Sequence, residues 1–321
     1  MKILITGVHG FVGMNLVDSL KHDHTIYGLD LVSPKRDGIE HTFNWSALDD
    51  LEGMELDAVI HLAGIAFDNK KNTDAQHCFD VNVELTQRIF DFFLASKMKK
   101  FIFLSSVKAA ADVVEGDVLT EDVVPSPKGP YGESKLAAEK YISSKMEDVR
   151  RKNKEVYILR PCVIHGPNSK GDLNLLYNVT RWGIPWPLGS FENQRSFTSI
   201  YNLCFVVDGL LKKPVASGVY HVADDETIST NKLIEIVCQS VGKKARIWHV
   251  SKGVMERFAK VGNVLHLPLN TKRFTKLTEN YVVSNEKIKA ALGITQMPVR
   301  AKEGLERTIE SFKKAGVKVT V

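Results

Sequence analysis

The stretch Lys2-Ile3-Leu4-Ile5-Thr6-Gly7-Val8-His9-Gly10-Phe11-Val12-Gly13 decides the fold of this chain. An apolar run followed by three spaced glycines predicts a strand, a tight turn and a helix that begins near residue 11. Glycines at this spacing let the backbone turn tightly and approach a pyrophosphate closely. The following helix then points its N-terminal amide groups at the phosphates. The stretch therefore indicates a dinucleotide site.

A second predicted strand, Thr25-Ile26-Tyr27-Gly28-Leu29-Asp30, ends in a carboxylate 23 residues after Gly7. An acidic side chain at this distance is placed to hold the adenosine ribose hydroxyls of NAD. Strand, helix and acid together predict NAD as the cofactor. Asp30 also disfavours NADP, because its charge repels a 2′-phosphate.

The composition is that of an ordinary soluble globular protein. The 321 residues are 44% hydrophobic and 25% charged, and no apolar stretch is long enough to span a bilayer. Four widely spaced cysteines, without a CxxC pair or a signal-peptide pattern ahead of them, favour reduced thiols in a cytoplasmic protein. The net charge of +5 is modest, and the basic runs at 97–100 and 150–154 follow predicted helices, so we expect no nucleic-acid partner.

The first 160 residues alternate apolar strands with longer helical patterns. We predict strands at 2–6, 25–30, 57–62, 100–105 and 155–160, and helices at 11–22, 74–97 and 131–149. Such alternation is typical of an α/β protein with a Rossmann-type doubly wound parallel sheet. We expect a NAD-binding domain over 1–165. A smaller C-terminal α/β substrate-binding lobe is expected over 166–321, with some segments returning to the sheet. The helices predicted there span 172–182, 202–212, 229–241, 251–262 and 301–315.

The candidate catalytic residues lie near the ends of two predicted elements. Tyr131 and Lys135 are four residues apart at the start of a helix, so they share one helical face. A neighbouring ammonium favours the phenolate, and we therefore predict that Lys135 lowers the pKa of Tyr131. Ser106 ends a strand at the expected nicotinamide edge of the sheet. The three side chains suit removal of a proton from a secondary alcohol while its carbon loses hydride to NAD. The histidines show no pairing with carboxylates at metal-ligand spacing, so no metal is expected.

An ordered set of short motifs extends over nearly the whole chain. After the glycine loop come His61-Leu62-Ala63-Gly64, Ser105-Ser106, Tyr131-Gly132-Glu133-Ser134-Lys135, Leu159-Arg160-Pro161, Gly166-Pro167 and Arg195-Ser196-Phe197. The chain resembles the extended short-chain dehydrogenase/reductase superfamily, in its branch of NAD-dependent nucleotide-sugar epimerases and dehydratases. Each motif is weak alone, but the ordered set is specific.

The resemblance implies a role for each matching residue. The cofactor-binding residues it implies are Gly7, Gly10, Phe11, Val12, Gly13, Asp30, Leu62, Ala63 and Gly64, together with Tyr131 and Lys135. Tyr131 is implied to be the base, Lys135 to bind the nicotinamide ribose, and Ser106 to bond the reacting sugar oxygen. Asn82 matches a structural asparagine of the family. Arg195, assisted by Arg273, is implied to hold the diphosphate of a UDP-sugar, because guanidinium groups bind phosphate oxygens bidentately.

Some residues depart from the motifs of the family, and these departures limit which of the family's activities we expect. No carboxylate follows Ser106 until Asp112, whereas family dehydratases carry an acidic pair there, so dehydration is disfavoured. Lys108 stands in this segment, and contact with the substrate diphosphate and simple exposure to solvent both remain open. His165 occupies a place where tyrosine is common, and it either touches the sugar or packs internally.

Three functions follow from these observations. We favour a UDP-sugar 4-epimerase, acting on a UDP-hexose or a UDP-N-acetylhexosamine through a transient 4-ketosugar. The alternative is a NAD(P)H-dependent reductase of a UDP-4-keto-6-deoxy-hexosamine, which would use the same three catalytic side chains. A non-catalytic dinucleotide-sensing module has no need of that set. The resemblance also implies a homodimer through helices near 80–96 and 131–149. Which sugar is bound, and whether it is soluble or lipid-linked, stays open.

Overall fold

The central element of the fold is a parallel β-sheet. The computed structural model describes residues 1–65, 75–169, 173, 176–177, 183–265 and 269–314. Seven strands lie in the order β3-β2-β1-β4-β5-β6-β9, and every neighbouring pair is parallel. They are β1 (Lys2–Thr6), β2 (Thr25–Leu29), β3 (His41–Phe43), β4 (Ala58–His61), β5 (Lys100–Leu104), β6 (Glu155–Pro161) and β9 (Gly218–Val222). The strand order reverses between β1 and β4, which is where ligands of doubly wound sheets bind.

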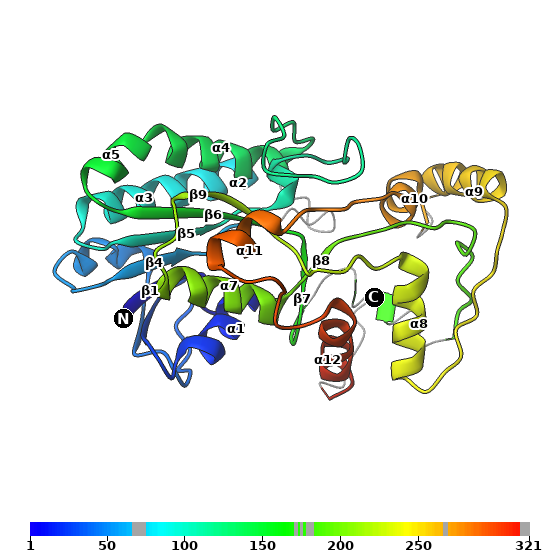
Figure 1. Ribbon diagram of the computed structural model, residues 1–321, viewed down its shortest axis with the longest axis horizontal. Helices are drawn as coiled ribbons and strands as arrows, with labels where there is room; N and C mark the ends of the chain where they lie inside the picture. The colour runs from blue at the N-terminus through cyan, green and yellow to red at the C-terminus, as the bar shows by residue number, and fades with distance from the viewer. Residues whose placement is uncertain (66–74, 170–172, 174–175, 178–182, 266–268, 315–321) are drawn as a thin grey trace.

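Helices cover both faces of this sheet, as Figure 1 shows. The α-helices are α1 (Phe11–Leu20), α2 (Ala75–Phe79), α3 (Leu85–Ala95), α4 (Pro130–Ser144), α5 (Met146–Arg151), α7 (Ile200–Lys212), α8 (Thr230–Ser240), α9 (Lys252–Val264), α10 (Thr271–Thr278), α11 (Glu286–Leu292) and α12 (Ala301–Lys314). A π-helical turn, Asp80–Glu84, joins α2 to α3. Short 3₁₀ turns span Trp45–Ala47, Asp49–Leu51 and Val107–Ala109.

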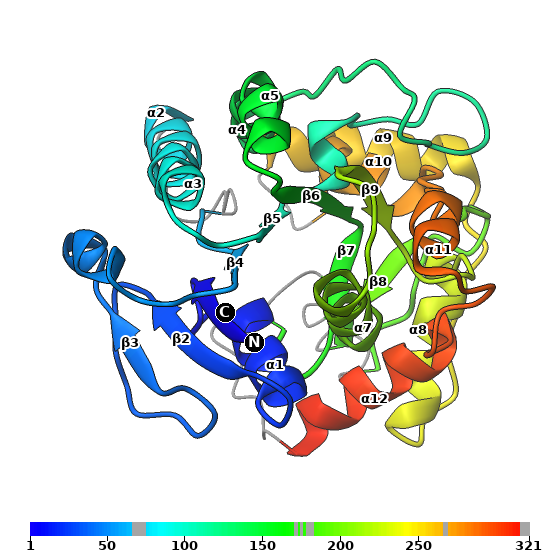
Figure 2. The same ribbon diagram turned by 60° about the vertical axis from the view of Figure 1, so that its left-hand side comes forward.

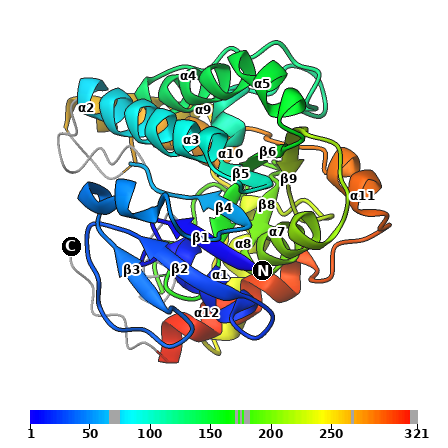
Figure 3. The ribbon, with the colours of Figure 1, turned by 90° about the vertical axis from the view of Figure 1, so that its left-hand side faces the viewer.

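The two faces of the sheet carry separate hydrophobic cores. Helices α1, α7 and α11 pack on one face, where Leu16 and Leu203 are fully buried. Helices α3 and α4 pack on the other, where Phe90 and Phe93 meet Phe101 of β5. Figures 2 and 3 show these two helical layers with the strands between them. Because both faces are covered, the central strands are apolar almost throughout, as parallel strands usually are.

A second structural region extends from the carboxyl ends of the strands. It holds a small parallel sheet of β7 (Val163–His165) and β8 (Phe197–Ser199). Helices α8 and α12 share one apolar cluster, and α9 and α10 share another with α8. In Figure 1 this region forms the right-hand end of the molecule, away from β1 to β5.

The predicted fold class is confirmed, and the five predicted strands coincide with β1, β2, β4, β5 and β6 to within two residues. Helices were also predicted correctly at α1, α7, α8, α9 and α12. The helix predicted over 172–182 lies mostly outside the described residues. The patterns at 74–97 and 131–149 each break into two helices. Strands β3, β7, β8 and β9 and helices α10 and α11 were not predicted, although a return to the sheet after residue 166 was allowed for.

Within the described part of the chain, no helix combines the length and apolarity that a membrane span requires.

Candidate active site

The glycine turn after β1 has the conformation that a dinucleotide loop needs. Gly7 has a φ of +69°, in the left-handed region that glycine tolerates and other residues rarely adopt. A Cβ atom on Gly13 would lie 2.5 Å from the carbonyl oxygens of both Gly7 and Val8. These two glycines are therefore required by the backbone itself, and they bring the first turn of α1 directly against the loop.

The N-terminus of α1 offers its amide groups without a competing protein group. Gly10 is the N-cap, no side chain caps the helix, and the first turn carries no acidic residue. An uncapped helix N-terminus of this kind suits a pyrophosphate. Half-buried Asp30 follows β2 beside the loop and accepts from the backbone amide of His9 at 2.9 Å and of Leu31 at 2.7 Å. A carboxylate has about four acceptor positions, so it can still accept from ribose hydroxyls. The residues present thus fit NAD.

A buried hydrogen-bond chain ties this loop to the end of β4. The Thr6 hydroxyl accepts from the amides of Leu62 and Ala63, each at 3.1 Å, and lies 2.7 Å from His61 Nδ1. His61 Nε2 lies 3.0 Å from the Thr86 hydroxyl, which donates to the Asn82 carbonyl. Since the Thr86 proton is used there, Thr86 accepts from Nε2, and Nδ1 accepts from Thr6. His61 is therefore neutral and carries its proton on Nε2.

This assignment predicts a pH dependence of stability. Burial places the pKa of His61 well below its ordinary value, so below about pH 6.5 the unfolded chain binds a proton that the folded protein excludes. Stability contributed by neutral His61 is thus present above that pH and is lost as the pH falls, by up to about 1.4 kcal/mol per pH unit. In denaturant unfolding, His61→Gln should show a shallower acid loss than the wild type. His22→Gln, at an exposed histidine, serves as the control, and an unchanged slope in His61→Gln would refute the assignment.

Asn82 fixes the segment that follows β4. From the π-helical turn, its side-chain oxygen accepts from the Ile65 amide at 2.8 Å, and its amide donates to the Ile65 carbonyl at 3.1 Å. The same amide donates to the Ser134 hydroxyl at 2.9 Å. A Cβ atom on Gly64 would lie 2.6 Å from the Asn82 oxygen. The π-helical turn thus presses Asn82 between the expected cofactor segment and the start of α4.

The three predicted catalytic side chains come together at the start of α4. Ser106 lies close enough to Tyr131 to interact with its hydroxyl. The Lys135 ammonium donates to the Leu104 carbonyl at 3.0 Å. Burial raises the pKa of Tyr131, and the interaction with Ser106 opposes that rise. Burial also lowers the pKa of Lys135 to about 8, and Glu139 opposes this. The prediction that Lys135 lowers the pKa of Tyr131 was therefore wrong for the protein groups alone, because burial of the phenol is the largest influence and raises that pKa.

A buried ion pair decides which of the two adjacent serines faces Tyr131. Arg160 and Glu139 have side chains only 4% exposed, and Arg160 Nε lies 3.0 and 3.2 Å from the two carboxylate oxygens. Ser105 donates its hydroxyl proton to Glu139. Ser105 is thus bonded to Glu139, whereas the Ser106 hydroxyl accepts a 3.2 Å bond from the Lys108 amide and interacts with Tyr131.

Basic side chains from three segments of the chain come together near the segment that follows Ser106. The Lys108 ammonium lies 3.1 Å from Asp112 and 4.6 Å from the centre of the Tyr281 ring. Burial lowers the pKa of Lys108, Asp112 opposes this, and the nearby charges of Arg195 and Lys276 lower it further. Arg195 donates to the Lys276 carbonyl. The structure therefore brings Lys108 and Arg195 together, and it adds Lys276, which the sequence analysis missed.

Arg273 and His165 are the other two residues predicted to contact the substrate, and their surroundings differ from those of Lys108 and Arg195. Arg273 stands on α10 one turn before Lys276, and its side chain is exposed. His165 is 1% exposed, with Nδ1 at 3.0 Å from the Thr308 hydroxyl and Nε2 at 3.5 Å from Asp224. Both ring nitrogens face protein groups, so His165 packs β7 against α12. Of the two possibilities left open for His165, these contacts correspond to internal packing.

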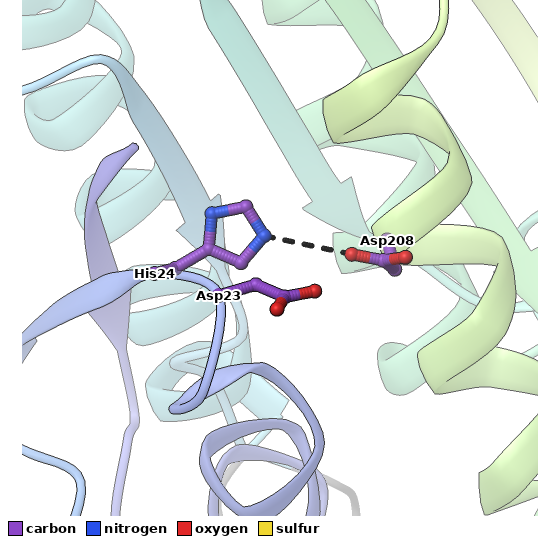
Figure 4. A group of neighbouring side chains, drawn as sticks. All are labelled: Asp23, His24 and Asp208. Atoms are coloured by element: carbon purple, nitrogen blue, oxygen red, sulfur yellow. Dashed lines mark ion pairs between the residues drawn. The ribbon is translucent and has the colours of Figure 1, made fainter.

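Among the described residues, His24 lies near two carboxylates, which the sequence interpretation did not anticipate. Asp23, His24 and Asp208 place potential ligand atoms within 4.8 Å of one another (Figure 4). The Lys212 ammonium lies 2.7 Å from Asp23 and 3.0 Å from Asp208. A cation of the chain thus already pairs with both carboxylates. The cluster precedes β2, at the amino edge of the sheet, and is not part of the candidate active site.

A glycine loop, a carboxylate beside it and a tyrosine–lysine–serine set at one sheet edge are features of an NAD-dependent enzyme built on a doubly wound fold. Comparison with known proteins agrees. The model of the NAD dependent epimerase/dehydratase family matches residues 3–223, and the chain belongs to this family.

The relatives include epimerases and a reductase. A UDP-glucose 4-epimerase of Vibrio cholerae is 30% identical over 98% of this chain and 96% of its own length. The N-acetyl-alpha-D-glucosaminyl-diphospho-ditrans,octacis-undecaprenol 4-epimerase of Escherichia coli O157:H7 is 26% identical over 96% and 94%. A GDP-6-deoxy-D-mannose reductase of Pseudomonas aeruginosa is 27% identical over 74% and 79%. The structure of a UDP-glucuronic acid 4-epimerase from Bacillus cereus in complex with NAD has the same fold, with a TM-score of 0.75, 21% identity and coverage of 98% and 99%.

Proposed function

We propose that the protein is an NAD-dependent UDP-sugar 4-epimerase, acting on a UDP-hexose or a UDP-N-acetylhexosamine. The observation that carries this proposal is the approach of Ser106 to Tyr131 at the start of α4, with buried Lys135 close to Gly64 at the carboxyl edge of the sheet. A site of this composition can remove a proton from a sugar hydroxyl and return one. The 30% identical UDP-glucose 4-epimerase supports the same activity.

Each of the three side chains has a defined task in this proposal. Tyr131 accepts the proton of the C4 hydroxyl and later returns it to the C4 oxygen. Ser106 holds that oxygen, and Lys135 binds the nicotinamide ribose. NAD, when bound, supplies the hydride acceptor and a positively charged ring that favours the phenolate form of a neighbouring tyrosine. The raised pKa of Tyr131 in the protein alone is consistent with a base that acts once the cofactor is in place.

The basic side chains near the segment that follows Ser106 are proposed to hold the diphosphate. Lys108 and Arg195 come from separate segments and influence one another electrostatically, as do Lys108 and Lys276. Asp112 pairs with Lys108, and the further positive charge of Arg195 and Lys276 near that pair favours the binding of an anion such as a diphosphate. Arg273 lies one turn from Lys276 on α10 and is proposed to assist. The uncapped amides of α1 are left to the pyrophosphate of the cofactor.

Incubation of the purified protein with UDP-glucose or UDP-N-acetylglucosamine, with no cofactor added, tests this function. NMR should detect the 4-epimer at catalytic levels, because an epimerase regenerates its NAD in each cycle. The better of the two substrates would identify the preferred sugar. If neither is converted while added NADH is oxidised by a UDP-4-keto-6-deoxy-hexosamine, the protein is a reductase instead. That alternative is supported by the reductase among its relatives but not by Asp30, which disfavours NADP.

A further inference from the structure

Helix α9 (Lys252–Val264) already has a buried face that joins it to the protein. Met255 and Ala259 are 5% and 1% exposed, and they share an apolar cluster with Trp186 and Phe274. One such face is enough to hold a peripheral helix against its neighbours. Further apolar residues on α9 are therefore not explained by the packing of the described chain.

A second apolar row runs along α9 and faces solvent. Val254, Phe258, Val261 and Leu265, just past the helix end, are 55%, 50%, 48% and 62% exposed. Their spacing of four, three and four residues places them on one side of the helix. Single exposed apolar residues are common on protein surfaces, but a continuous row marks an interaction site. We call these four residues the apolar row of α9.

The surrounding segment is the most basic part of the chain. Residues 243–276 contain nine lysines and arginines and a single acidic residue, Glu256, although the whole chain has a net charge of only +5. On α9 itself Lys252, Arg257 and Lys260 are exposed, and Arg257 and Lys260 directly precede members of the apolar row. The face therefore combines an apolar stripe with positive charge, which suits an anionic surface with an apolar interior.

The position of α9 leaves this face accessible. In Figure 1, α9 and α10 lie at the end of the long axis opposite β1 and the N-terminus, away from α3 and α4. The dimer expected from the family resemblance uses those latter helices. The helix packed against α9 is α10, which carries Lys276 beside Arg195. Through α10, helix α9 thus lies near the basic residues Lys276 and Arg195.

We propose that α9 docks this protein onto the surface of an anionic lipid bilayer. The apolar row enters the boundary between headgroups and acyl chains, and Arg257, Lys260 and their basic neighbours contact lipid phosphates. The proposal goes beyond the sugar chemistry, because docking does not depend on which sugar is bound. It involves attachment to one leaflet, for which a membrane-spanning helix is not needed.

Co-sedimentation of the full chain with lipid vesicles tests the proposal. The protein should sediment with vesicles of phosphatidylcholine mixed with phosphatidylglycerol, poorly with phosphatidylcholine alone, and less as salt is raised. Phe258→Ser combined with Val261→Ser should weaken vesicle partitioning by about tenfold or more. Arg257→Gln with Lys260→Gln should weaken it and flatten its salt dependence.

Matched controls separate docking from damage to the fold. Val124→Ser removes an apolar side chain that is 84% exposed elsewhere, and Lys97→Gln with Lys99→Gln removes two exposed charges from another basic run. Both should sediment like the wild type. Equal sedimentation of all variants, or none with the anionic vesicles, would overturn the proposal. So would a loss of oligomer mass in the Phe258 variant without vesicles, which would make α9 a contact between copies. Sugar turnover, measured separately, should survive in every variant, so failure of docking and failure of the proposed function are distinguishable.

Discussion

Tyr131→Phe lowers kcat by roughly 10²–10⁴-fold and leaves NAD binding intact. The phenol oxygen is the group proposed to exchange a proton with the sugar, and it interacts with Ser106. Phenylalanine keeps the ring packed at the start of α4 but removes that oxygen. Turnover of a UDP-sugar would be followed by NMR. NAD would be quantified by its release from the denatured protein.

Tyr141→Phe is the matched control for this substitution. Tyr141 stands on the same helix, α4, but its hydroxyl donates to Asp91 on α3 at 2.7 Å. Its removal should leave kcat within about twofold of the wild type, as expected for a surface change. Full activity in Tyr131→Phe would show that another group moves the proton and would refute the assigned base.

Arg160→Met destabilises the protein by about 3–5 kcal/mol. The substitution leaves the Glu139 carboxylate buried without its cation, and only the Ser105 hydroxyl then remains of the hydrogen bonds described for it. Because Glu139 lies one turn after Lys135 on α4, kcat should fall as well. Chemical denaturation would measure the free energy of unfolding.

Two further variants serve as comparisons for the destabilisation expected in Arg160→Met. Arg151→Met breaks a surface pair with Asp148, whose members are 69% and 39% exposed, and should cost no more than about 1 kcal/mol. Arg160→Met with Glu139→Leu removes both charges and should recover much of the lost stability. If Arg160→Met costs no more than Arg151→Met, the buried pair does not organise α4 as we describe.

Short sequence patterns were sufficient to predict the NAD-binding half of the fold. The glycine turn, Asp30 and the paired Tyr131 and Lys135 are set by short spacings along the chain, and each lies where its pattern predicts. The strands could also be predicted, because a sheet that is buried on both faces has few polar residues in its strands. The homodimer, the cytoplasmic location and the domain boundary near residue 165 stay predictions.

Features that depend on contacts between residues far apart in the sequence could not be predicted from it. The sequence gives no reason to join Lys276 to Lys108, which lies far earlier in the chain and meets it only through the fold. The burial of His165 depends on Thr308, more than a hundred residues later. The π-helical turn at Asn82 is likewise fixed by hydrogen bonds to Ile65 and Ser134 rather than by helix propensity. Such contacts also explain why burial rather than Lys135 sets the pKa of Tyr131.

The most direct test of the central claim follows the hydrogen at C4 of the sugar. The protein would be incubated with a UDP-sugar deuterated at C4 in ordinary water, and both epimers would be analysed by NMR and mass spectrometry. Oxidation and reduction at C4 by one bound cofactor predicts that deuterium stays at C4 in substrate and product alike. Loss of the label to solvent would contradict hydride transfer, and with it the roles assigned to Tyr131, Lys135 and Ser106.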